Sequence, residues 1–393
     1  MEFSEKQYAN RNRLKIRVSH FRGSVLARTS RASIQFNTTN SMNQSSGAVE
    51  GRGRYYPELD GLRALAALMV MAFHLAQAGI HIPGPLTFGQ TGVDLFFVLS
   101  GFLITSILLQ ARPGDWDEVK TFYVRRSLRI FPLYFGYLIG SSLLGELPSW
   151  QYWVYLQNFA IAWGVPVAGP GHFWSLAVEE QFYLVWPFLV LFSPRRWLAP
   201  ILWAMVFTSA GLGFYFSPGA SFYLTFTRLG GLAAGALLAV AHRRNLLEPH
   251  RRLLQVGILV FAVPMVGIGL VFRNVGLTWF VVVKYLLVTG FYACVVATQL
   301  VGSDSVASKF LRARGLRFIG RISYGLYVFH PAVFAFCLKR SVALPMWLQA
   351  SIAITAAFAI SVASWYGFER HFIKLKNRWA PEPRSSPHAL VEV

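Results

Sequence analysis

Long apolar segments alternate with short polar ones along this chain, from about residue 61 to residue 367. An α-helix needs about 20 mostly apolar residues to cross the hydrocarbon core of a bilayer. The pattern therefore predicts an all-α, polytopic membrane helical bundle with about ten transmembrane helices. The predicted spans cover residues 61–80, 92–110, 130–147, 173–193, 198–216, 222–241, 253–272, 276–300, 320–338 and 346–367.

The composition supports this prediction. Hydrophobic residues make up 54% of the 393 residues and charged residues only 14%, whereas soluble globular chains carry about 25% charged residues. This balance excludes a disordered chain and a simple soluble domain. A further apolar segment, residues 150–163, is rich in Trp and Tyr but too short to span a bilayer, so we expect it to lie at the membrane interface.

The basic residues predict the orientation of the chain. If the N-terminus is cytoplasmic, the cytoplasmic segments hold 32 of the 37 Lys and Arg residues. Cytoplasmic loops of membrane proteins carry such an excess, so both termini are predicted to be cytoplasmic. The net charge of +20 then needs no nucleic-acid partner. The predicted organisation is a basic, disordered tail over 1–54, a transmembrane domain over 55–372 and a second cytoplasmic tail over 373–393.

Ionisable side chains within a span are costly, so each is a functional candidate. In the first span, His74 lies eleven residues after Arg63, which is about 16 Å along a helix that rises about 1.5 Å per residue. This spacing predicts Arg63 at the cytoplasmic edge and His74 near the middle of the membrane. A neutral imidazole can act as a general base near pH 7. A buried histidine that only bonds a neighbouring helix is the alternative.

The fourth span contains two adjacent carboxylates, Glu179 and Glu180, in an otherwise apolar helix. Adjacent helical residues point about 100° apart, so we expect only one of the two to face a site. Ser175, Glu179 and Tyr183 follow one another at intervals of four residues. They are therefore predicted to share one face of the helix.

The depth of Glu179 in the membrane suggests a partner for His74. Counted from the outer end of its span, Glu179 lies within about one helical turn of the depth of His74. The two side chains can meet if their helices are neighbours, and the carboxylate would then orient the imidazole. The alternative is a structural ion pair between Glu179 and Arg228 or Lys284.

The second cytoplasmic loop, residues 111–130, contains Arg126 and Arg129. If this segment is helical, the spacing of three residues puts both on one face. Guanidinium groups bind phosphates through paired hydrogen bonds, so a phosphorylated cytosolic donor fits this pair. From the residues alone, however, anchoring at the cytoplasmic surface without any ligand is the favoured interpretation.

Other polar or reactive residues have simpler interpretations. Asp94, near the outer end of the second span, either orients a substrate or caps its helix. His330 in the ninth span could bind a ligand, but it is interpreted as a buried core histidine. The two cysteines, Cys294 and Cys337, lie in apolar segments and indicate neither a disulfide framework nor a metal site.

Six segments occur in an order that resembles one family of integral membrane enzymes. They are LDGLRALAALMVMAFH, GQTGVDLFFVLSGFLIT, FYVRRSLRIFPLY, GHFWSLAVEEQFYLVWP, TRLGGLAAGALLA and ISYGLYVFHP. Each segment alone is weak, but six in order are specific. In these segments, and from about Tyr56 to Phe372, the chain resembles the acyltransferase 3 family.

The resemblance implies transfer of an acyl group, commonly acetyl, from cytosolic acyl-CoA to a hydroxyl group. The acceptor would be an extracytoplasmic carbohydrate, such as lipopolysaccharide, exopolysaccharide or a lipid-linked glycan. Acyl-CoA would be the donor substrate, with no metal and no tightly bound cofactor. The location implied is the bacterial cytoplasmic (inner) membrane, with the protein as a multi-pass component.

The family motifs assign roles to individual residues. Its Arg–ten residues–His pattern falls on Arg63 and His74, and its Arg-x-x-Arg pattern falls on Arg126 and Arg129. The arginines would bind the CoA phosphates. His74 would act as a base or as an acyl carrier, and Glu179 would hold the imidazole. Residues expected to bind or support the acceptor are Asp94, His172, Ser175, Glu180 and Tyr183.

Two other functions stay open at this point. Some members of the family acylate secondary metabolites such as macrolides instead of glycans. A transporter for a lipid-linked sugar would also place His and Glu within the membrane, as a proton relay, without catalysing a reaction.

Overall fold

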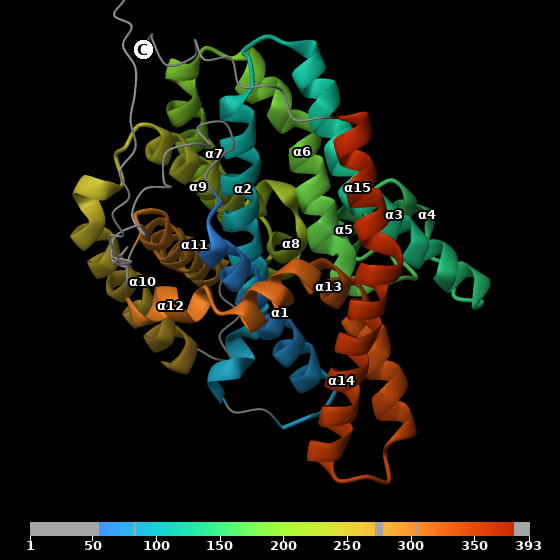
Figure 1. Cartoon of the computed structure of the whole chain (residues 1–393). Helices are drawn as coiled ribbons and strands as arrows, with labels where there is room; N and C mark the ends of the chain where they lie inside the picture. The colour runs from blue at the N-terminus through green and yellow to red at the C-terminus, as the bar shows by residue number, and fades with distance from the viewer. Residues whose placement is uncertain (1–54, 82–83, 272–277, 303–304, 381–393) are drawn as a thin grey trace, which may run out of the picture. The chain divides into compact units, whose positions relative to one another are not determined.

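Helices form the regular structure of the chain wherever it is described. The computed structural model describes residues 55–81, 84–271, 278–302 and 305–380, and each of the ten predicted spans coincides with one long helix (Figure 1). The long helices are α1 (Pro57–Gln77), α2 (Gly92–Gln110), α3 (Trp116–Leu143), α6 (Trp174–Phe192), α7 (Arg195–Tyr215), α9 (Thr225–Arg243), α10 (Arg251–Val271), α11 (Thr278–Leu300), α13 (Arg314–Arg340) and α14 (Met346–Ser364). The all-α prediction is confirmed.

Within the described residues, seven stretches are long and apolar enough to cross a membrane. They contain α1, α2, α6, α7, α11, α13 and α14, so the chain is a polytopic membrane protein. The other three predicted spans fall on α3, α9 and α10. Arginines in the first half of α3 and the many Gly and Ala residues of α9 lower the hydropathy of these two helices. The total of ten spans therefore stays a prediction.

Short helices connect the long ones. The predicted interfacial segment folds into α4 (Trp150–Trp153) and α5 (Gln157–Ala162), both too short to span a bilayer. The other short elements are η1 (Gly84–Thr91), η2 (Gly171–Phe173), α8 (Pro218–Tyr223), η3 (Glu248–His250), α12 (Val306–Leu311) and η4 (Trp365–Glu369).

Helix α3 begins well before the apolar segment that predicts it. Asp115 caps its N-terminus by accepting a hydrogen bond from the backbone N–H of Asp117 (2.9 Å). Acidic residues in the first turn add to this stabilisation because they face the positive end of the helix dipole. Residues 111–130, predicted to be a loop, are thus mostly helical, and Arg126 and Arg129 lie midway along α3.

Helix α15 (Arg370–Trp379) extends the folded structure beyond residue 372, where the second tail was predicted to begin. It packs against α3, and the Arg125 guanidinium donates a hydrogen bond to the Ala380 carbonyl (3.0 Å). The predicted tail over 1–54 and the last residues, 381–393, lie outside the described residues.

Glycines set the closest contacts between the central helices. A Cβ atom on Gly101 of α2 would overlap the Leu232 carbonyl of α9, and one on Gly235 of α9 would overlap the Val98 carbonyl of α2. At Gly320, α13 approaches the backbone of α1 equally closely. Small residues permit such close packing of membrane helices, and the contacts fix the helices that surround the site.

Candidate active site

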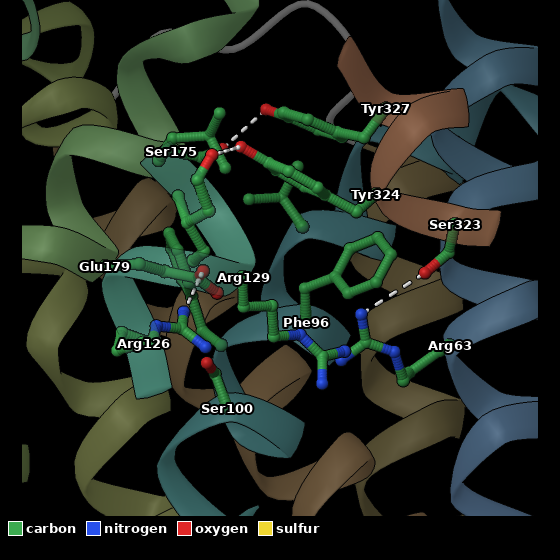
Figure 2. A pocket seen from close by; sticks show the side chains of 14 residues that line it. Arg63, Phe96, Ser100, Arg126, Arg129, Ser175, Glu179, Ser323, Tyr324 and Tyr327 are labelled. Atoms are coloured by element: carbon green, nitrogen blue, oxygen red, sulfur yellow. Dashed lines mark hydrogen bonds and ion pairs between the residues drawn. The ribbon is translucent and has the colours of Figure 1, made fainter. Parts of the chain in front are cut away.

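A pocket lies inside a closed ring of helices, in which α1, α2, α6, α3 and α13 each pack against the next and α13 returns to α1. Its empty volume is about 640 Å³. Figure 2 shows the lining side chains, with Ser175 and Tyr327 toward the top and Arg63, Arg126 and Ser100 toward the bottom. The polar and charged lining residues are Arg63, Ser100, Arg126, Arg129, Ser175, Glu179, Ser323, Tyr324 and Tyr327.

Arg126 binds both glutamates of α6. Its Nη2 atom lies 3.6 Å from Glu179 Oε2, and its Nε atom lies 3.6 Å from Glu180 Oε1. Its guanidinium also lies 3.8 Å from the centroid of the Tyr183 ring, and the Tyr183 hydroxyl hydrogen-bonds Ser100. Two carboxylates therefore neutralise Arg126. As expected for neighbouring positions on a helix, Glu179 lines the pocket and Glu180 does not.

Arg63 and Arg129 differ from Arg126, because neither has a carboxylate within ion-pair distance among the described residues. Arg63 donates a hydrogen bond to Ser323 Oγ (3.3 Å) and lies 6.0 Å from the Phe96 ring centroid (Figure 2). Arg129 lines the pocket and remains exposed. Two arginines that face one pocket without an ion-pair partner in the described part of the chain suit a ligand with several negative charges.

Hydroxyl groups connect α6 to α13 at the Ser175 end of the pocket. The Tyr327 hydroxyl lies 2.5 Å from Ser175 Oγ (Figure 2). It also lies 2.5 Å from the His172 carbonyl. Since a carbonyl oxygen can only accept, Tyr327 donates to His172 and Ser175 donates to Tyr327. His172 is therefore in direct contact with a residue of the pocket wall.

Three imidazoles meet behind this wall. The ring centroids of His74 and His330 are 4.9 Å apart, and the His172 centroid lies 5.5 Å from His330 and 6.2 Å from His74. The Nε2 atom of His330 is 3.0 Å from Nδ1 of His74. Among the described residues, no group of His, Cys, Asp or Glu is arranged to hold a metal ion.

Pro331 alters α13 beside these imidazoles. Proline has no backbone N–H, so the carbonyl four residues earlier, that of Tyr327, loses its helical partner. The next carbonyl along, that of Val328, accepts a hydrogen bond from His172 Nε2 (3.3 Å). His172 thus bonds the backbone of α13 one residue beyond the carbonyl that Pro331 leaves without a helical partner.

The predicted pairing of His74 with Glu179 does not occur in this structure. No hydrogen bond or ion pair joins them within the described ranges: His74 bonds Val70 and His330, whereas Glu179 contacts Arg126. Similar depth does not make two helices neighbours: α1 packs mainly against α13, η1 and α2, while α6 packs against α2, α3, α5 and α9. His74 also lies in the last turn of α1 and does not line the pocket.

Asp94 lies outside the pocket and pairs with Arg228. Its Oδ1 atom is 2.6 Å from Arg228 Nη2, with side-chain exposures of 9% and 3%. The Arg228 guanidinium also lies 4.2 Å from the Tyr285 ring centroid. The N-cap residue of α2 is Thr91, and no side-chain capping bond forms there. Asp94 therefore neutralises a buried arginine instead of capping α2, and the alternative pair of Glu179 with Arg228 is absent.

A family model described as an acyltransferase domain matches residues 56–366. The chain belongs to this acyltransferase family. The match confirms the resemblance carried by the six ordered segments, and it covers every helix that lines the pocket.

Several bacterial proteins are similar to this acyltransferase. Peptidoglycan O-acetyltransferase OatA of Listeria monocytogenes serovar 1/2a is 28% identical over 79% of this chain and 55% of its own length. "Putative peptidoglycan O-acetyltransferase YrhL" of Bacillus subtilis is 28% identical over 81% of this chain and 55% of its own. The chain thus spans about half the length of these curated relatives. No solved structure matches it.

The sequence prediction missed the part that α13 plays in this acyltransferase. Ser323, Tyr327 and His330 come from the ISYGLYVFHP segment and lie four and then three residues apart, which places them on one helix face. Ser323 and Tyr327 line the pocket, and His330 contacts His74. That spacing, together with a histidine followed by proline inside an apolar span, was the available signal.

Proposed function

We propose that this acyltransferase is a membrane O-acetyltransferase that moves an acetyl group from cytosolic acyl-CoA to a hydroxyl of a cell-surface glycan. The observation that carries the proposal is one pocket that contains two arginines without an ion-pair partner among the described residues, Arg63 and Arg129, and a wall residue, Tyr327, whose ring centroid lies 5.4 Å from that of His172. This arrangement suits a ligand that has phosphates at one end and a reactive group at the other.

Arg63 and Arg129 are the residues assigned to the donor phosphates. CoA carries a diphosphate and a 3′-phosphate, and planar guanidinium groups bind such oxygens through paired hydrogen bonds. Arg126 is not assigned to the phosphates, because Glu179 and Glu180 already neutralise it. Its role is to hold α3 against α6.

His74 is the residue assigned to the reaction. Its imidazole would take the proton of the acceptor hydroxyl while the hydroxyl oxygen attacks the thioester carbonyl. The new C–O bond forms, the C–S bond breaks, and the proton passes from the imidazole to the departing CoA thiolate. The products are the O-acetyl ester and free CoA, so the imidazole ends neutral as it began.

The acceptor class rests on the relatives and on exposed aromatic residues. Two of the similar proteins carry peptidoglycan O-acetyltransferase in their names. Trp150 and Trp163, in the segment that precedes His172, are each 65% exposed. Aromatic rings of this kind pack well against the apolar faces of sugars. A glycan hydroxyl, as in peptidoglycan, is therefore the acceptor proposed here.

The test uses the full chain, purified and placed in lipid nanodiscs with acetyl-CoA and a muramic-acid-containing disaccharide. The wild type is expected to release CoA thiol and to add one acetyl mass to the sugar. His74→Gln should lose transfer by roughly 100-fold or more. His250→Gln, in an exposed histidine of η3, is the matched control and should keep full activity.

Arg129→Gln tests the donor site in the same assay. Loss of one phosphate contact should raise KM for acetyl-CoA about tenfold or more and leave KM for the acceptor unchanged. The matched control is Arg251→Gln, an exposed arginine at the start of α10. Transfer at the wild-type rate by His74→Gln would contradict the proposal, as would movement of a lipid-linked sugar without any release of CoA.

A further inference from the structure

We infer that His330 is a positioning residue, which holds His74 in the tautomer with its proton on Nδ1 and leaves Nε2 with a free lone pair. The inference about the tautomer stands on geometry. Its consequence for acetyl transfer rests on the function proposed above.

The hydrogen bond on the far side of His330 fixes the tautomer of His330 itself. Its Nδ1 atom lies 2.8 Å from the Leu326 carbonyl, and a carbonyl oxygen can only accept, so Nδ1 carries a proton. His330 is fully buried, and no carboxylate contacts it among the described residues, so the neutral ring is strongly favoured. A neutral imidazole with a proton on Nδ1 has its lone pair on Nε2.

Two acceptors then fix the tautomer of His74. Its Nδ1 atom lies 3.0 Å from His330 Nε2 and 3.0 Å from the Val70 carbonyl. Both of these atoms are acceptors, so Nδ1 of His74 must be the donor and its N–H is shared between them. In the neutral ring, Nε2 of His74 is then unprotonated, as a general base requires.

His172 forms no hydrogen bond with any described residue that would change the tautomer of His74. Its Nε2 atom lies 3.3 Å from the Val328 carbonyl and therefore donates to it. Within the described residues no hydrogen bond joins His172 to His74, whose rings are 6.2 Å apart. The role predicted for Glu179, to orient the imidazole, thus falls to a histidine on α13.

Solid-state NMR of full-length protein in bilayers, labelled with ¹⁵N-histidine, tests the inference without any substrate. The His74 signals are identified by their loss in His74→Gln. We expect a protonated Nδ1 and an unprotonated Nε2 in the wild type. Protonation of Nε2 in the neutral His74 ring would overturn the inference.

Two variants separate positioning from simple packing. His330→Gln places an amide oxygen near the former Nε2 position and keeps an acceptor for His74, whereas His330→Leu offers none. Both lose the bond to Leu326, so they share the structural defect. In His330→Leu the Val70 carbonyl still accepts from His74 Nδ1, so we expect only part of the His74 population to shift toward protonated Nε2, whereas His330→Gln should keep the wild-type tautomer.

Kinetics give the second readout. kcat should fall about twofold to fivefold in His330→Leu, in step with the fraction of the tautomer that is lost, and recover largely in His330→Gln, with KM for acetyl-CoA unchanged in both. An unchanged tautomer in His330→Leu, or equal loss of kcat in both variants, would contradict positioning. If His330→Leu does not fold, the protonation of His74 Nδ1 and Nε2 in the wild-type spectrum still tests the inference. The expected tautomer in a protein that transfers no acetyl group would contradict the proposed function and leave this inference intact.

Discussion

Arg126 differs from the other arginines of the pocket because two carboxylates form ion pairs with it. Its partners, Glu179 and Glu180, have side chains that are only 14% and 11% exposed. Carboxylates at such sites depend on their counter-ion, because removal of one partner leaves an uncompensated buried charge. Arg129 has no such partner within the described residues, so its removal leaves no buried carboxylate without its counter-ion.

This difference predicts unequal effects on stability for two arginine-to-glutamine substitutions one helical turn apart. Arg126→Gln should destabilise the protein by about 3–5 kcal/mol and lower the thermal unfolding midpoint in detergent. Arg129→Gln should leave the midpoint nearly unchanged. Neutralising the carboxylates as well, with Glu179→Gln and Glu180→Gln, should restore part of the stability. Equal midpoints for the two single variants would contradict the assignment.

Sequence reasoning identified single residues better than their partners. Ionisable residues in apolar helices pointed to Arg63 and Glu179, because burying a charge is expensive wherever the helix packs. The partner of Glu179 depends on which helix lies opposite, and hydropathy carries no information about that. His330 was interpreted as core because a histidine that positions another and one that only fills space have the same local sequence.

At the scale of elements, glycine backbones determine how closely α2 and α9 approach. A Cβ atom on Gly235 would lie 2.0 Å from the Val98 carbonyl oxygen, and a helix backbone cannot shift cheaply to accommodate it. Gly140 of α3 has the same residue type in a helix, but nothing lies within 4 Å of its Cβ position.

Alanine at these two positions is therefore a matched comparison. Gly235→Ala should separate α2 from α9 and destabilise the protein by about 1–3 kcal/mol or more. Gly140→Ala should be neutral or stabilising by up to about 1 kcal/mol, because alanine favours the helix. Folded yield and thermal unfolding of the purified variants measure both effects, and a Gly235→Ala variant as stable as the wild type would refute the close packing.

The elements themselves were largely predictable, since the ten apolar segments coincide with long helices. The errors concern helices that are not apolar along their length. Helix α3 starts in a charged segment with an N-terminal cap, and α15 is a basic helix that packs on α3. Hydropathy registers neither, because capping and tertiary contacts stabilise these segments.

At the scale of the whole molecule, orientation rests on the excess of Lys and Arg in alternate loops. It requires α3 to cross the membrane, although α3 is not among the seven stretches that qualify by hydropathy. The two ends of α3 are therefore the decisive positions. Asp117 lies at one end and Glu146 just beyond the other, and both are exposed.

Cysteine labelling tests this topology in a background with Cys294→Ala and Cys337→Ala. A membrane-impermeant maleimide applied to intact cells should label Glu146→Cys and should reach Asp117→Cys only after permeabilisation. The reverse pattern would invert the predicted orientation. Labelling of both positions from the same side would mean that α3 does not cross.

The two arginines assigned to the donor phosphates have a consequence for the proposed enzyme as part of a cell. Acetyl-CoA and free CoA carry the same phosphate groups, so Arg63 and Arg129 cannot distinguish the donor substrate from the product. Free CoA should occupy the same place as acetyl-CoA, and turnover should follow the ratio of the two. Decoration of the envelope would then slow when central metabolism runs short of acetyl units, with no separate regulator.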